Sequence, residues 1–419
     1  MTTLKSHELA CLSEDDSWEL FSRKAFCNGA EEQSELLTIG RAIVKKCRGL
    51  PLALKTIGGL MSSKQQVQEW KAIEESNIGD NACGKDEIIS VLKLSYRHLP
   101  SEMKQCFAFC SVFAKDCEME KDILIQLWMA NGLIQEERTI DLSQKGELIF
   151  HYLVWRSFLQ DVKEKEVQFG RIIHKEICCK MHDLMHDLAK DVAGECATVE
   201  DLIQQRASIN GTRHMQIITW SEVEQINGLL KGKADLHTLL APYTPNKNLK
   251  ELKLMSLRAL RVASGTIHDQ VLNAKHLHYL DLSESGIVRL PDSVCVLYNL
   301  QTLRLNGCWK LQLLPDDMSA MSKLIHIYLL GCDSLERMPQ KISLLKNLHT
   351  LTTFVVDSKD GHGINELKDL RHLANMLELY NLRKAKSGQD AKQANLHQKQ
   401  NIRELSLYWG RSKDEKSEQ

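Results

Sequence analysis

Residues 277–282 read LHYLDL, and this spacing of leucines defines the C-terminal half of the chain. The same pattern begins again at residues 257, 300 and 324, as LRALRV, LQTLRL and LIHIYL, so successive starts are 20, 23 and 24 residues apart. Prolines follow apolar residues at positions 291, 315 and 339, in two steps of 24. A period of this length is typical of a leucine-rich repeat, which forms a short strand, a turn and a variable return segment.

Weaker copies of the pattern flank these four units. LHTLLA at 236–241 and IRELSLYW at 402–409 keep part of the leucine spacing, and the period changes from about residue 212 onward. The last ten residues, GRSKDEKSEQ, are polar and follow directly on a strand-like unit. A repeat array needs a polar unit over its last apolar face, so the sequence predicts a chain that is truncated at this end.

Upstream of the repeats, apolar residues recur at helical spacing. Ser13 precedes three acids, an arrangement that suits a helix N-terminus. A second helix is expected over about 31–47. Gly49, which follows it, can end the helix by adopting a left-handed conformation. Pro51 can begin the next helix, because its missing N–H costs nothing at the first helical position. The sequence therefore predicts a helical bundle at this end of the chain.

Residues 85 to about 200 predict a second helical unit. The segment VQFGRIIHKEICCK (167–180) alternates loosely, as a short hairpin does, before the last helix. The helix expected at DILIQLWMANG (122–132) is too apolar for a surface helix. It carries no Lys or Arg, and DNA recognition requires basic side chains on the helix that enters the groove. We therefore expect a packing helix there and no nucleic-acid partner.

Composition excludes several classes of protein. The 419 residues are 43% hydrophobic and 26% charged, with a net charge of −1, which calls for neither nucleic acid nor an anionic membrane as partner. No apolar run reaches the roughly 18 residues of a membrane helix, and the N-terminus lacks the apolar region of a secretory signal. The 13 Cys have no framework spacing, so reduced thiols and a cytoplasmic location are expected.

No motif for catalysis or phosphate binding occurs in the chain. The sequence contains neither G-x-x-x-x-G-K-[ST] nor G-x-G-x-x-G, the loops whose backbone cradles phosphates. No catalytic Ser-His-Asp or Cys-His order stands out either, so we expect no enzymatic activity. Cys178, His182 and His186 are four residues apart, which suits zinc, but no C-x-x-C pair supports such a site. We therefore assign no metal.

Four segments in a fixed order carry a family resemblance. They are WELFSRKAF (18–26), GLPLA (49–53), SYRHLPSEMKQCFAFCSVFAKD (95–116) and KMHDLMHDLA (180–189), and the leucine repeats follow them. Together they resemble the plant NB-ARC leucine-rich-repeat disease resistance proteins, in particular the coiled-coil branch. The resemblance spans essentially the whole chain.

The resemblance implies a domain order. The C-terminal helical part of the NB-ARC region would occupy 1–80, a winged-helix domain that ends in a Met-His-Asp motif would occupy 81–200, and leucine-rich repeats would occupy 201–419. The expected fold is a mainly α N-terminal half, consisting of a helical subdomain plus a winged helix, followed by an α/β leucine-rich-repeat solenoid.

The resemblance also implies a nucleotide. In the family, ADP keeps the receptor closed and ATP replaces it on activation. The matching residues are His182, which would contact a phosphate, and Pro51, which would lie against the adenine, while Asp183 would orient His182 or cap the helix. A helix end contributes only about 0.3–2 kcal/mol to anion binding, whereas micromolar affinity needs about 8 kcal/mol. Because the family's phosphate-binding loop would lie upstream of Met1, we expect weak or no binding of ADP or ATP by this chain alone.

The repeats are the expected protein-binding surface. In LxxLxL the x positions point out of the concave sheet, and exposed side chains in adjacent repeats indicate a protein contact. These candidate residues are Tyr279, Asp281, Arg304, Asn306, His326 and Tyr328. The resemblance implies a pathogen effector or a guarded host protein as partner. It also implies contact with the nucleotide-binding and coiled-coil domains of a receptor, in cis or in trans.

Two other interpretations stay open on the sequence alone. One is a stand-alone leucine-rich-repeat interaction protein that acts in trans without nucleotide, and rescue of a receptor that lacks this half would support it. The other is the product of an incomplete gene, which a phosphate-binding loop encoded upstream of Met1 would support.

Overall fold

The computed structural model describes residues 10–26, 34–76, 85–137, 140–204, 210–218, 235–241, 255–262, 271 and 273–410. The chain packs into two compact units. Met1–Lys121, Leu133–Lys163 and Ile177–Ala193 form the first, and Asp122–Gly132, Glu164–Glu176 and Gly194–Gln419 form the second. The second unit therefore combines the repeats with two short segments from the N-terminal half.

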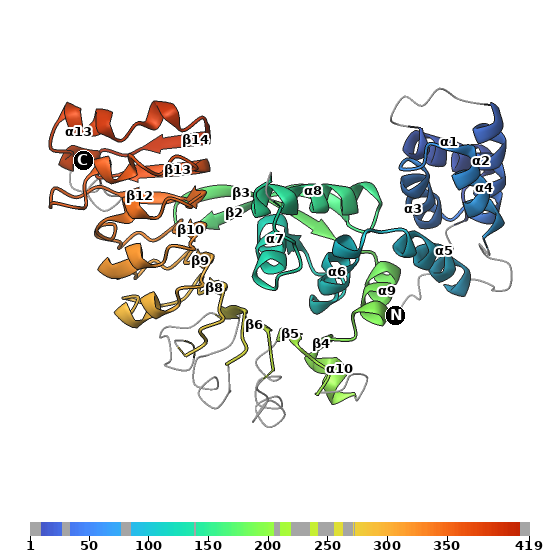
Figure 1. The fold of residues 1–419 in the computed structure, drawn as a ribbon, viewed down its shortest axis with the longest axis horizontal. Coiled ribbons are helices and arrows are strands. Elements are labelled where there is room, and N and C mark those ends of the chain that lie inside the picture. The colour runs from blue at the N-terminus through green and yellow to red at the C-terminus, as the bar shows by residue number, and fades with distance from the viewer. Residues whose placement is uncertain are drawn as a thin grey trace, which may run out of the picture. The chain divides into compact units, whose positions relative to one another are not determined.

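Helices α1 to α5 begin the first unit (Figure 1). They span Glu14–Ala25 (α1), Ser34–Lys46 (α2), Pro51–Met61 (α3), Val67–Glu75 (α4) and Lys85–Arg97 (α5). The side chain of Ser13 accepts the backbone N–H of Asp16 and caps α1, as predicted. Gly49 has a φ of +71° after α2, and Pro51 is the first residue of α3, which confirms both predictions. The predicted start of α2 near residue 31 lies outside the described residues.

The helical bundle encloses an apolar core. Phe21 of α1, Ile43 of α2 and Leu54 of α3 have no exposed surface. The ring of Trp70 in α4 meets Phe21 edge-on, with 6.2 Å between centroids. This burial explains why the apolar residues recur at helical spacing, since each helix turns one stripe toward its neighbours.

Further helices and a small sheet complete the N-terminal half. The elements are α6 (Ser101–Phe109), β1 (Met119–Glu120), α7 (Lys121–Ala130), α8 (Leu142–Trp155), β2 (Gln160–Phe169), β3 (Ile172–Lys180) and α9 (Asp183–Ala193). The sheet order is β1-β3-β2, with β1 antiparallel to β3. The predicted hairpin is confirmed. Every residue from Ile123 to Ala130 of α7 is buried, so α7 is a packing helix, as predicted.

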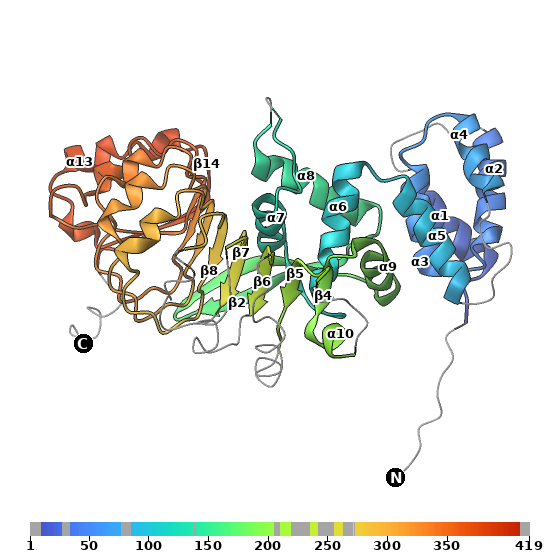
Figure 2. The ribbon, with the colours of Figure 1, turned by 60° about the horizontal axis from the view of Figure 1, so that its bottom comes forward.

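The repeats form one parallel sheet in chain order. Its strands are β4 (Cys196–Thr198), β5 (His214–Gln216), β6 (Thr238–Ala241), β7 (Ala259–Val262), β8 (Tyr279–Asp281), β9 (Thr302–Arg304), β10 (His326–Tyr328) and β11 (Thr350–Leu351). Figure 2 shows β4 to β8 side by side. Leu280 pairs with Leu303, and Leu303 with Ile327, so the sequence period becomes a ladder of equivalent residues. The solenoid is confirmed.

A second parallel sheet follows the first along the array. It contains β12 (Thr353–Val355), β13 (Ala374–Tyr380) and β14 (Asn401–Leu407), and the helix α13 (Gly388–Gln393) lies between the last two in sequence. The return segments are short 3-10 helices, and Pro291 and Pro315 precede two of them, at Asp292–Val296 and Asp316–Ala320. This accounts for the regular spacing of the prolines, since proline fixes the φ that such a turn needs.

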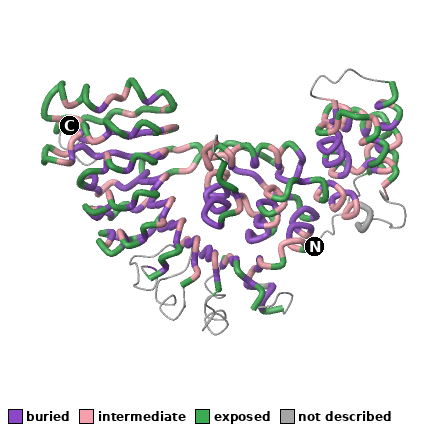
Figure 3. Tube along the Cα trace, viewed as in Figure 1, coloured by how far each residue is buried: buried purple, intermediate pink, exposed green. Residues whose placement is uncertain are grey.

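The leucines of the repeats fill one continuous core. Leu277, Leu280 and Leu303 are fully buried within it. The strands β8, β9 and β10 are buried throughout, whereas exposed residues lie in the segments between them (Figure 3). Because successive strand residues point to opposite faces, the residues between the leucines lie on the inner face of the array.

The tip of the β2–β3 hairpin lies against a turn of the repeats. Gly331 has a φ of +71°, and a Cβ atom built there would lie 2.9 Å from the Cβ of Phe169. Only glycine therefore fits this close approach. In the described part of the chain, no helix is long and apolar enough to cross a membrane.

Candidate functional site

Met181, His182 and Asp183 form the turn between β3 and α9. Met181 is buried, whereas His182 and Asp183 are exposed. The Nδ1 atom of His182 accepts the backbone N–H of Leu184 at 3.2 Å, so the ring caps the helix in the manner of an N-cap side chain. A neutral ring whose Nδ1 accepts carries its proton on Nε2. This N–H is a hydrogen-bond donor at a helix N-terminus, the kind of place where phosphate groups bind.

The cap that was predicted for Asp183 is provided by His182 instead. A ring nitrogen can accept a backbone N–H as a carboxylate does, and His182 stands one residue before the helix, where a cap has to be. One turn along α9, the Nε2 of His186 lies 2.7 Å from the carbonyl oxygen of Phe113. His186 is thus a buried structural residue, and burial lowers its pKa.

Pro51 is exposed at the start of α3, after a tight turn. A Cβ atom on Gly49 would lie 2.5 Å from the carbonyl oxygen of Leu12, so glycine is required there. A cleft of about 520 Å³ lies beside this turn, and cationic side chains contribute to its lining: Arg41, Lys45 and Arg48. No pattern in the sequence predicted this cleft. Within the described residues, no contact joins Pro51 to His182, and neither residue lines the cleft.

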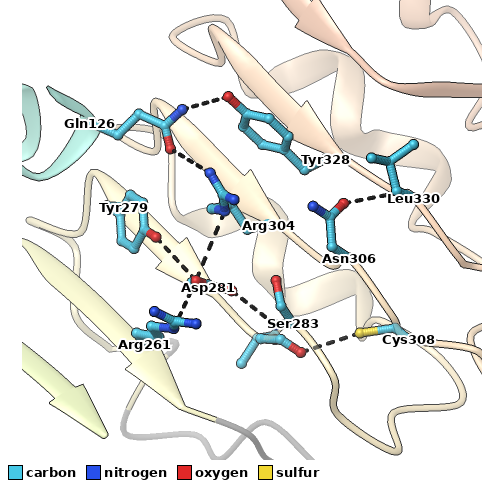
Figure 4. Close-up of polar contacts among 11 residues, drawn as sticks. Gln126, Arg261, Tyr279, Asp281, Ser283, Arg304, Asn306, Cys308, Tyr328 and Leu330 are labelled. Atoms are coloured by element: carbon cyan, nitrogen blue, oxygen red, sulfur yellow. Dashed lines mark hydrogen bonds and ion pairs between the residues drawn. The ribbon is translucent and has the colours of Figure 1, made fainter. Parts of the chain in front are cut away.

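The side chain of Gln126 on helix α7 contacts the inner face of the repeats (Figure 4). The Nε2 of Gln126 donates to the hydroxyl oxygen of Tyr328 at 2.6 Å, and the Nη1 of Arg304 donates to the Oε1 of Gln126 at 3.3 Å. The Arg304 guanidinium also lies 4.3 Å from the centroid of the Tyr328 ring. Gln126 uses both ends of its amide, which fixes its orientation.

Asp281 is the acidic centre of the same face. Its Oδ2 lies 3.2 Å from the Nε of Arg261 and 4.0 Å from the Nε of Arg304, and it accepts the hydroxyl of Tyr279 at 3.1 Å. Burial by itself would raise the pKa of Asp281, but the two guanidinium groups and hydrogen bonds from Ser283 outweigh it and lower the pKa. The carboxylate is therefore ionised, and Arg304 links it to Gln126.

A second contact fixes the end of α7. The Oγ1 of Thr238 donates to the Oδ1 of Asn131 at 3.1 Å. The Nη1 of Arg258 donates to the backbone oxygen of Asn131 at 2.9 Å. The segment that begins with α7 is therefore bound to β6 and to the residue before β7 at one point, and to β9 and β10 at another.

The prediction that these inner-face residues are exposed is wrong. Tyr279, Asp281, Arg304 and Tyr328 are between 0% and 7% exposed, because they contact α7 and one another. Their partner in this structure is a helix of the same chain. A role for them in binding another protein stays a prediction.

Asn306 and His326 are buried for a different reason. The Oδ1 of Asn306 accepts the backbone N–H of Leu330 at 2.9 Å, so the side chain links successive turns of the array. The Nδ1 of His326 lies 3.0 Å from the Oγ1 of Thr350. Burial, together with His349 and Arg304, lowers the pKa of His326 to about 3, so the ring is neutral.

Two family models match the chain. The disease resistance protein winged helix domain matches residues 112–189, and the leucine-rich repeat region matches residues 239–419. Disease resistance protein RGA2 of Solanum bulbocastanum is 38% identical over 412 residues, and RPP13-like protein 1 of Arabidopsis thaliana is 38% identical over 431 residues; each alignment covers 98% of this chain. The chain belongs to the plant disease resistance proteins.

Membership of this family confirms the resemblance read from the four motifs. The winged-helix match includes α7 and the Met181–Asp183 turn, so both candidate sites lie partly within it. The chain spans 39% of the length of RGA2 and of RPP13-like protein 1. The domain boundaries at 80/81 and 200/201, and the nucleotide contacts of His182, Pro51 and Asp183, stay predictions.

Two residues of interest escaped the sequence analysis. Gln126 is a polar residue within a run of buried positions in α7, and a buried amide is rarely left without partners, so it could have been singled out. Glu378 is 1% exposed on β13, in a segment whose leucine spacing is too irregular to predict which residues point inward.

Proposed function

We propose that this member of the plant disease resistance proteins carries the switch and the sensor of an immune receptor. In a receptor with a nucleotide-binding part, in cis or in trans, the repeats keep α7 bound while ADP is present. A pathogen effector or a guarded host protein then occupies the repeats and releases α7, and ATP replaces ADP. The role is regulatory rather than catalytic.

The amide of Gln126 carries this proposal. It is bonded to Tyr328 and Arg304 at once, and a partner that contacts these two side chains has to displace it. A buried amide that loses its partners costs about 1–3 kcal/mol, and a two-state equilibrium shifts measurably on that scale. Binding of a partner and binding of α7 are therefore alternatives for the same side chains.

The turn at His182 supports the nucleotide half of the proposal. Its Nδ1 is engaged by the Leu184 N–H, so the Nε2 proton faces away from the helix and suits a phosphate oxygen. The resemblance stated from the Met-His-Asp motif assigns the same contact. A single donor at a helix end is too weak for micromolar affinity, and we expect weak or no ADP binding by this chain alone.

The test compares Gln126→Ala with Gln144→Ala, a substitution of an exposed glutamine on α8. We expect backbone amides of α7 to exchange hydrogen faster in Gln126→Ala and at the wild-type rate in Gln144→Ala. In leaf cells that express the full receptor at equal protein level, Gln126→Ala should cause cell death without a pathogen. A Gln126→Ala receptor with faster exchange in α7 but no cell death would show that release of α7 is not the trigger.

A further inference from the structure

A small cleft lies in the second unit, between a turn after β10 and the strands β12 and β13. It has a volume of about 20 Å³. Its apolar lining includes Leu329, Leu335 and Val355, and its polar lining includes Asp333, Glu378 and Tyr380. A space of this size accepts a group about as large as one or two water molecules, since a water needs about 10–15 Å³ on this measure.

Glu378 gives this cleft a buried carboxylate. Its side chain is 1% exposed, and its Oε2 accepts the hydroxyl of Tyr380 at 3.2 Å. In the described part of the chain, no Lys or Arg side chain forms an ion pair with it. The charged neighbour that acts on it is Asp333, a second acid. Among the described residues, Tyr380 and Cys332 are the other titratable groups that line the cleft.

Asp281 provides an internal comparison. It is equally buried on β8, but two guanidinium groups neighbour it and its pKa is lowered. Burial without such partners raises the pKa of Glu378 to about 7. The chain thus pairs the carboxylate of Asp281 with two of its own guanidinium groups. Within the described residues it provides no such partner for Glu378, which lines a cleft that is open to the surface.

We infer that this cleft receives the ammonium group of a lysine side chain from a protein bound to the repeats. The inference rests on the proposed function of the repeats as a protein-binding surface and adds the chemistry of the contact. An ammonium is a compact point charge, whereas the guanidinium of arginine is planar and larger.

The affinity of such a contact should depend on pH. A cation beside Glu378 favours the carboxylate, so the group gives up its proton when the lysine enters. The affinity should therefore rise by about tenfold between about pH 6 and 8, as the ionised fraction of Glu378 in the free protein increases. A contact made only by apolar surface would not change over this range.

The experiment measures retention of the labelled full chain on arrays of short random peptides. One set has a central lysine, and matched sets have norleucine or arginine in its place. We expect the lysine set to bind about tenfold more strongly than the norleucine set at pH 8, with less preference at pH 6. Glu378→Gln should remove the preference, and Glu336→Gln, which alters an exposed glutamate, should keep it.

Equal retention on the lysine and norleucine sets would overturn the inference, and so would a lysine preference that survives Glu378→Gln. An arginine set that binds as well as the lysine set would overturn the size argument. No variant of α7 is involved. Failure here therefore leaves the release of α7 untouched, and failure of the leaf assay leaves the lysine preference untouched.

Discussion

The Nε2 atom of Gln126 lies 2.6 Å from the hydroxyl oxygen of Tyr328, although 202 residues separate the two in sequence. The same amide accepts a hydrogen bond from Arg304 through its oxygen. A helix that belongs to the winged-helix family match is thereby tied to strands β9 and β10 of the repeats. The strength of this tie can be measured by removing one atom at a time.

Tyr328→Phe removes the hydroxyl group and keeps the ring. The amide of Gln126 then loses its acceptor in a buried place, so the free energy of unfolding should fall by about 1–3 kcal/mol. Urea unfolding of the purified chain measures this difference. Tyr298→Phe is the control, because Tyr298 is 54% exposed. Equal stability of the two variants would mean that the hydrogen bond between Gln126 and Tyr328 contributes nothing to the free energy of unfolding.

Gly331→Ala tests the approach of the hairpin tip to the repeats. Alanine in the left-handed region costs about 1–2 kcal/mol, and its Cβ would also lie 2.9 Å from the Cβ of Phe169. The thermal midpoint should therefore fall. Gly286→Ala should leave it unchanged or raise it slightly, since no atom lies within 4 Å there and the change restricts the unfolded chain. A wild-type midpoint for Gly331→Ala would contradict the close approach.

The stability of the chain should depend on pH through Glu378. Its pKa is about 7 in the folded chain and 4.5 in the reference state, so the folded state binds more protons between these values. The free energy of unfolding should therefore fall as pH rises from about 4.5 to 7, by about 3 kcal/mol from this group. Urea unfolding of wild type and Glu378→Gln across this range isolates the effect. Parallel curves would show that Glu378 titrates normally.

Substitutions of His182 can separate its role as the cap of α9 from its proposed contact with ADP. His182→Ala removes the cap on α9 and should cost about 0.5–2 kcal/mol of stability, whereas His182→Asn should keep most of the cap. Both substitutions should weaken ADP binding in a receptor that has the nucleotide-binding part, because asparagine does not place a donor where the Nε2 of His182 does. Wild-type ADP affinity in His182→Asn would mean that His182 acts through the cap alone.

Local signals predicted most of the elements. The leucine period located β7 to β10, Ser13 and Pro51 located the starts of two helices, and the alternation at 167–180 located the hairpin. These features depend on residues that are neighbours in the chain. The strand β4 was missed because Ala197 fills its core-facing position in place of leucine.

The sites were harder to predict because they depend on distant partners. The outward direction of Tyr279 and Arg304 was inferred correctly from the repeat pattern. Arg304 is nevertheless buried against α7, which lies more than a hundred residues upstream. Similarly, the lack of an ion pair to Glu378 within the described residues is a property of the packed array. No local pattern contains that information.

The two hydrogen bonds that Gln126 forms, one with Tyr328 and one with Arg304, constrain how such a chain can evolve. A repeat array can gain new recognition by changing side chains on its inner face, one position at a time. Positions 304 and 328 are exceptions, because a single change at either leaves one end of a buried amide without a partner. Under the proposed function, such a change favours a receptor that signals without a pathogen. Changes there should therefore arise together with a change at position 126, and new specificity should first appear in repeats that α7 does not touch.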